Sequence, residues 1–104
     1  MEELERTDDY KTIRGLDISS CSLVSLEGIE KFTSLKKLDL SNNLLLSIQG
    51  LENLQQVEEL NLGFNPIQDY SPLYKLKNLK KLFIPYNAAE IRKLKEQFPN
   101  LQIN

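Results

Sequence analysis

Apolar residues recur along this chain at a fixed spacing of twenty-two residues. Three columns define the pattern: Ile13, Leu35, Val57, Leu79 and Leu101; Leu16, Leu38, Leu60 and Leu82; and Ile18, Leu40, Leu62 and Ile84. Further apolar columns follow in each period, among them one that contains Leu23, Leu45 and Ile67 and one that contains Ile29, Leu51 and Leu73. A fixed period in this range indicates a solenoid, in which each unit buries its apolar side against its neighbours.

Each period begins with the pattern of a short strand. In the third period, Leu60 and Leu62 alternate with polar residues, as in a strand with one buried face. Pro66 and Pro72 then argue against a long helix on the return path, because proline has no backbone N–H to donate. A short 3₁₀ turn or an extended segment is expected there instead. The stacked units therefore predict a parallel sheet of about five strands with an irregular opposite side.

A polar column follows each strand and contains Cys21, Asn43, Asn65 and Asn87. An asparagine amide bonds backbone groups that a turn leaves unpaired, so these residues predict a ladder stacked inside the solenoid. Cys21 is expected to be its first rung, as a small buried residue with a weak S–H donor. Asn87, with Glu90 three residues later, also matches a capping box and thus has two possible roles.

These residues resemble the leucine-rich repeat family. The run Leu35, Leu38, Leu40, Asn43 and Leu45 matches its pattern LxxLxLxxN/CxL. The twenty-two-residue spacing is similar to the class found in a nuclear regulator of protein phosphatase and in bacterial internalins, and segment 67–73 is similar to the internalin return path. The resemblance covers residues 13–103 and implies a right-handed α/β solenoid of about four repeats with a concave parallel sheet. It is specific for the fold and leaves the function open.

The two ends depart from the repeat, which divides the chain into three parts. Residues 1–12 form an N-terminal flank or partial cap, in which only Met1, Leu4 and Tyr10 are able to cover the first strand. Residues 13–87 are the repeats, and residues 88–104 are a C-terminal cap. In that cap one helical face carries Ala88, Ile91, Leu94 and Phe98, and a last short strand follows Pro99.

Composition narrows the class of protein. A length of 104 residues allows one domain, and a net charge of −2 gives no bulk attraction to nucleic acid or anionic lipid. No apolar run approaches the ~20 residues of a membrane span, and the N-terminus lacks a signal peptide, so a complete chain is expected in the cytoplasm. The single cysteine excludes an internal disulfide, and the absence of histidine removes the commonest general base.

Strand residues that do not face the core line the concave side. The aromatic residues Phe64, Phe83 and Tyr86 gather on the C-terminal strands, as anchors of protein interfaces do. The alternative is that Phe64 or Phe83 packs on a neighbour and serves only the fold. The predicted partner-binding set is Phe64, Phe83, Tyr86, Asn61, Asp39, Asn42, Lys37, Glu59 and Lys81.

Equivalent positions on three adjacent strands carry charges of alternating sign: Lys36 and Lys37, Glu58 and Glu59, and Lys80 and Lys81. At the ~4.8 Å spacing of strands these charges pair across the sheet, and their alternation disfavours nucleic-acid binding. Asp17 and Asp39 fall short of the roughly six to eight oxygens that calcium prefers. The exposed serines have no histidine to activate them, so we expect no metal, no cofactor and no catalysis.

The sequence thus favours a non-enzymatic protein–protein interaction module that binds a protein or peptide on its concave face. The sheet offers a face of only ~300 to 400 Å², whereas a stable interface takes ~800 Å² from each side. This area favours a short peptide, a single helix or a weak contact, unless the turns near Asn42 and Phe64 also contribute. The alternative is a structural, scaffold or regulatory segment of a larger assembly, as in the phosphatase regulator. A monomer is expected, although the unpaired strand edge at residues 13–18 is able to pair with a second chain and form a dimer.

Overall fold

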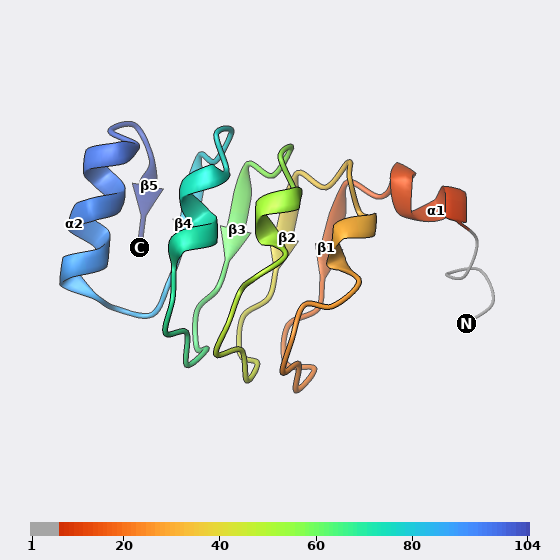
Figure 1. The fold of residues 1–104 in the computed structure, drawn as a ribbon, viewed down its shortest axis with the longest axis horizontal. Helices are drawn as coiled ribbons and strands as arrows, with labels where there is room; N and C mark the ends of the chain where they lie inside the picture. The colour runs from red at the N-terminus through yellow and green to blue at the C-terminus, as the bar shows by residue number, and fades with distance from the viewer. Residues whose placement is uncertain (1–6) are drawn as a thin grey trace.

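A single parallel sheet runs the length of the molecule in the computed structural model, which describes residues 7–104. Its five strands lie side by side in chain order, and Figure 1 shows α1 and α2 at opposite ends of the row. The strands are β1 (Gly15–Asp17), β2 (Lys37–Asp39), β3 (Glu59–Asn61), β4 (Lys81–Phe83) and β5 (Gln102–Ile103). The predicted α/β solenoid is confirmed.

The register of the sheet follows the twenty-two-residue spacing. Leu38 pairs with Leu16 on one side and with Leu60 on the other, and Leu60 pairs in turn with Leu82. Each of these strands has three residues, and the middle one points into the core because side chains alternate along a strand. The first and third residues therefore face the concave side, where the candidate site lies.

Short 3₁₀ helices form the opposite, convex side, where 3₁₀ or extended segments were predicted. They are η2 (Ile29–Lys31), η3 (Leu51–Asn53) and η4 (Ser71–Lys75). Gly50 precedes η3 with φ of 112°, and a Cβ there would lie 3.2 Å from Ile29 Cγ2. Glycine is therefore required where one repeat packs closely on the one before it. No described helix is long and apolar enough to cross a membrane.

The core fills the space between the sheet and the 3₁₀ helices. The apolar columns predicted from the sequence are buried in the middle repeats, with Leu40, Leu45, Leu51 and Leu62 inaccessible to solvent. Tyr70 is also buried, although the apolar periodicity did not include it. It occupies the position that Leu26 and Ile48 hold in the preceding repeats.

Buried asparagine amides connect successive turns. Asn65 Nδ2 is shared among the carbonyl oxygens of Leu40 at 2.9 Å, Leu62 at 3.1 Å and Gly63 at 3.2 Å. Its Oδ1 accepts the Leu45 N–H at 3.2 Å. Asn43 repeats this arrangement one turn earlier, where its Oδ1 accepts two backbone N–H groups. These amides satisfy backbone groups that water does not reach.

The two outer members of the polar column differ from the ladder prediction. Cys21 is exposed instead of buried; its N–H donates to Asn43 Oδ1 and its Sγ lies 3.3 Å from the Ser19 carbonyl. The reason is that no described repeat precedes β1 and covers this turn. Asn87 caps α2 and accepts the Glu90 N–H at 3.1 Å, because the chain enters a helix here instead of another turn.

The C-terminal cap consists of α2 (Ala88–Gln97) and β5. Leu94 is fully buried, and Ile91 and Phe98 pack against the core from the same side of the helix. The Tyr74 hydroxyl donates to Glu90 Oε2 at 2.5 Å and so ties η4 to α2. Ala88, expected on the packed face, is exposed at the first turn of the helix.

The N-terminal flank contains α1 (Thr7–Thr12). The Tyr10 ring packs edge-on against Phe32 with centroids 4.9 Å apart, and Lys31 Nζ lies 5.4 Å from the Tyr10 centroid. Tyr10 therefore covers part of the first repeat. Met1 and Leu4, also expected to contribute, lie outside the described residues.

The contact between η4 and α2 makes stability depend on pH at the alkaline end. Burial, the hydrogen bond to Glu90 and the charge of that carboxylate raise the pKa of the Tyr74 phenol well above its usual range. An unfolded chain loses this proton near pH ~10, whereas the folded chain retains it. The stabilising contribution is therefore complete below pH ~10 and is lost as the pH rises further.

We expect the Tyr74→Phe variant to show a shallower fall of unfolding free energy above pH ~10, measured by urea titration at each pH. An equally steep fall in both chains would contradict this assignment.

Candidate functional site

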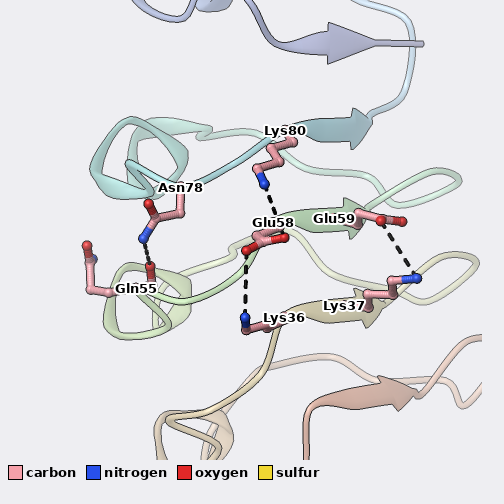
Figure 2. A network of polar contacts seen from close by, with 7 residues as sticks. All are labelled: Lys36, Lys37, Gln55, Glu58, Glu59, Asn78 and Lys80. Atoms are coloured by element: carbon pink, nitrogen blue, oxygen red, sulfur yellow. Dashed lines mark hydrogen bonds and ion pairs between the residues drawn. The ribbon is translucent and has the colours of Figure 1, made fainter.

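Charged side chains lie at the first residue of strands β2 to β4 and at the residue just before it. Glu58 lies between two lysines, 3.9 Å from Lys36 Nζ and 3.5 Å from Lys80 Nζ, as Figure 2 shows. Glu59 lies 3.7 Å from Lys37 Nζ on the neighbouring strand. These pairs are partly exposed, so each contributes about 0 to 1 kcal/mol. The remaining lysine of the set, Lys81, has no ion-pair partner among the described residues.

A column of acidic and amide side chains closes the turns after the strands. Asp39 Oδ1 accepts the Ser41 N–H at 2.9 Å and the Ser41 hydroxyl at 2.7 Å. Asp17 makes the same pair of bonds with Ser19, whose hydroxyl and N–H lower the Asp17 pKa and keep the carboxylate charged. Asn61 Oδ1 accepts the Gly63 N–H in the next repeat. One oxygen of each aspartate thus serves the fold, and the other remains available on the concave face.

The three aromatic residues border one hollow at the C-terminal end of the sheet. Its volume is about 490 Å³, and its other lining residues include Ser41, Asn61 and Pro85. Phe64 is 81% exposed, Tyr86 87% and Phe83 43%. The structure therefore brings these side chains together without burying Phe64 or Tyr86 against a neighbour.

The hollow continues along the concave face toward β1. A second depression of about 450 Å³ extends from Gly15 on β1 to Phe83 on β4. Asn61 and Phe83 line both depressions, so the two adjoin and form one concave groove. Its N-terminal half is acidic through Asp17 and Asp39, and its C-terminal half is aromatic, with Lys81 beside Phe83 on the same strand.

The turns after β1, β2 and β3 each place the residue at one equivalent position in the left-handed backbone region. Asn42 has φ of 57° and Phe64 has φ of 56° at the equivalent position of the next repeat. Asparagine tolerates this conformation, and Asn42 Nδ2 also donates to Ser20 Oγ at 2.9 Å. Asn42, predicted as a binding residue, is therefore engaged in joining two turns. A phenylalanine in this conformation is strained.

The described residues do not include a group of three or more His, Cys, Asp or Glu side chains arranged to hold a metal ion. Asp17 and Asp39 face the groove, but both are bound to the serines of their own turns. To a ligand, the groove offers apolar contacts from its aromatic residues, a cationic contact from Lys81 and anionic contacts from the two aspartates.

A second set of exposed apolar side chains escaped the sequence analysis. Val24 is 70% exposed, Leu44 55% and Leu46 54%. They flank the partly buried Leu23 and the buried Leu45 on the segments that follow the turns. Each of these residues is apolar and lies next to a member of an apolar column in the sequence. A search restricted to the columns does not select such a residue.

The comparisons with known proteins agree with this geometry. A family model described as leucine-rich repeats in two copies matches residues 11–53, and one described as a leucine-rich repeat matches residues 53–69. No match was found among curated protein sequences.

Three solved structures share the fold. An internalin (inlF) from Listeria monocytogenes is 33% identical over 75% of this chain, with a TM-score of 0.73. A leucine-rich repeat protein from Leptospira interrogans is 25% identical over 90% of it, with a TM-score of 0.78. Internalin C2 from Listeria monocytogenes is 25% identical over 93% of it, with a TM-score of 0.77. The chain spans 23%, 26% and 43% of these proteins, respectively. By its repeats, its ladder and these similarities, the chain belongs to the leucine-rich repeat family.

Proposed function

We propose that this chain is a non-enzymatic protein-interaction module that binds its partner in the concave groove. Leucine-rich repeat folds generally serve as protein-interaction modules. The site would be centred on Phe64, Phe83 and Tyr86, with Lys81 and the two aspartates at its margins. The partner is a protein or peptide that presents an apolar side chain to the aromatic hollow.

Phe64 carries this proposal. Its ring is 81% exposed, so burial of the side chain contributes little to folding. Its backbone lies in the left-handed region, which costs a residue with a Cβ roughly 1–2 kcal/mol. The equivalent position one repeat earlier holds Asn42, which tolerates this conformation. A strained residue that contributes little to the core is best explained by a contact outside the molecule.

The proposal is tested by comparing two triple variants that remove similar apolar side chains from different surfaces. We expect Phe64→Ala/Phe83→Ala/Tyr86→Ala to lose the partner that the natural chain captures from a lysate of the source organism. Val24→Ala/Leu44→Ala/Leu46→Ala should retain it, because those exposed side chains do not line the groove. Binding would be quantified by titration of the identified partner, with circular dichroism as the control for folding. Loss of binding only in the second variant would move the site to that other surface.

A single substitution separates binding from stability at the same position. Phe64→Asn introduces the residue that the preceding repeat uses in this turn. We expect the free energy of unfolding to rise by about 0.5–1 kcal/mol, because asparagine relieves part of the left-handed strain. Partner affinity should fall at least tenfold in the same variant, measured by calorimetry. A variant that gains stability and keeps its affinity would argue against Phe64 as a binding residue.

A second candidate function is that of a scaffold segment that joins another chain at its N-terminal end. A mostly apolar hollow of about 420 Å³ opens there, lined by the partly buried residues Ile13, Leu16, Ile18 and Leu23. The outer edge of β1 pairs with no described strand. A molecular mass that rises with concentration in sedimentation equilibrium would support this function, and a constant monomer mass would count against it.

A further inference from the structure

We infer that the occupant of the concave groove is an amphipathic α-helix of the partner, which lies across the strands in a fixed charge order. An apolar anchor on the helix fills the aromatic hollow, an acidic residue next to it meets Lys81, and basic residues meet Asp39 and Asp17. This inference rests on the proposed function and specifies the partner class for the same site.

The backbone of the sheet favours a helix over an extended peptide. The strands are paired in parallel register from β1 to β5, so their N–H and C=O groups are directed at one another within the sheet. An extended peptide that lies across this face would find no backbone partners, and its own amides would lose water without replacement. A helix satisfies its backbone internally and needs only side-chain contacts. Its diameter of ~10 Å also matches the length of three-residue strands at ~3.3 Å per residue.

The register of the sheet sets the spacing of the contacts. Asp17, Asp39, Asn61 and Phe83 pair in sequence across four neighbouring strands. At ~4.8 Å per strand, Phe83 lies about 10 Å from Asp39 and about 14 Å from Asp17. A helix rises ~1.5 Å per residue, so these distances correspond to about seven and about ten residues. Positions i, i+7 and i+10 or i+11 share one helix face, so a single face reaches the hollow and both aspartates.

The charges of the groove set the order of acidic and basic side chains along the bound helix. Lys81 lies two residues from Phe83 on β4 and has no ion-pair partner among the described side chains, whereas Lys37 is paired with Glu59. Asp17 and Asp39 each use Oδ1 for the turn, and no hydrogen bond from a described residue reaches Oδ2. A helix with its acidic side chain near the anchor and its basic side chains seven or more residues away complements both ends. The reverse order would place like charges together.

The test is a selection from a phage-displayed library of random 18-residue peptides on the natural chain, after depletion on Phe64→Ala/Phe83→Ala/Tyr86→Ala. We expect the enriched peptides to carry an apolar anchor, an acidic residue within one turn of it and Arg or Lys at seven and at ten or eleven residues. They should be helical when bound, as judged by NMR chemical shifts of labelled peptide. Their affinity should fall at least tenfold on Lys81→Glu.

Two further variants refine the charge test. Asp17→Asn/Asp39→Asn removes both negative charges but keeps the Oδ1 acceptor that Asn61 uses in the third repeat, so the turns stay closed. It should also weaken the enriched peptides at least tenfold. Lys75→Glu, on the convex η4, is the matched control and should leave affinity unchanged.

The outcomes separate this inference from the proposed function. Peptides that need the aromatic residues but bind in an extended form, or that ignore Lys81→Glu and the double aspartate variant, would overturn the helix inference and leave the binding groove in place. An absence of enriched peptides would overturn both the helix inference and the proposed function. Peptides that bind the triple aromatic variant as well as they bind the natural chain would also overturn both.

Discussion

Replacing Asn65 by alanine is expected to lower the free energy of unfolding by about 3 kcal/mol, since each buried polar group left unpaired costs roughly 1–3 kcal/mol and some regain water. The substitution removes the hydrogen-bond partner of the Leu62 carbonyl and of the Leu45 N–H. The Leu40 and Gly63 carbonyls each lose one of two donors. Such a loss is a large part of the 5–15 kcal/mol that typically stabilises a domain. Urea denaturation followed by circular dichroism measures it.

Asn78→Ala is the matched control for this prediction. The Asn78 side chain is exposed and donates one hydrogen bond, to the Gln55 carbonyl at 2.8 Å (Figure 2). We expect its loss to cost less than about 1 kcal/mol, because water replaces an exposed partner. If Asn65→Ala were no more destabilising than Asn78→Ala, the ladder would not be the source of stability inferred here.

The second large effect is expected at the C-terminal cap. Leu94→Ala should lower the free energy of unfolding by about 3 kcal/mol, within the range of 2–5 kcal/mol for a leucine truncated in a core. Leu94 is inaccessible to solvent and is the residue of α2 that lies deepest in the core. In a solenoid each unit contacts only its neighbours, so a weakened cap should open before the central repeats do. Hydrogen exchange should therefore rise first in 88–103.

Lys93→Ala serves as the control, because Lys93 is exposed on the same helix. A loss below about 1 kcal/mol is expected for it, as for most surface substitutions. Uniform acceleration of exchange along the whole chain in Leu94→Ala would show that the cap and the repeats unfold as one unit, which contradicts the local opening predicted here.

The concave groove is small, and this bears on the kind of partner. Phe64 and Tyr86 lie at the turns beyond the strand ends and enlarge the surface that the sheet alone provides. The estimate of ~300 to 400 Å² for the sheet suits one helix better than a folded domain. Because the chain spans less than half of the similar internalins, the activity of a longer assembly is a separate question from the binding of this segment.

The sequence determined the parts of the structure that repeat. Leu38, Leu60 and Leu82 recur at one spacing because each unit buries the same side chain against the next. The positions of Asn43 and Asn65 follow from the same logic, since every buried turn has the same unpaired backbone groups. Pro66 and Pro72 likewise argued against a long helix on the return path of the third repeat. These features depend on residues within one period and its neighbour, so a periodic pattern contains them.

The tertiary structure decided what happens where the repetition ends and what the concave side chains contact. Cys21 is exposed and Asn87 caps a helix, because neither has a described repeat on both sides. Asp39 closes its own turn, Glu59 pairs with Lys37 and leaves Lys81 free of a described ion pair, and Phe64 is held out in a strained turn. Periodicity assigns a residue to a face of the sheet, but the partner of an exposed side chain depends on rotamers, turn geometry and distances across strands. Those are set only when the whole chain is folded.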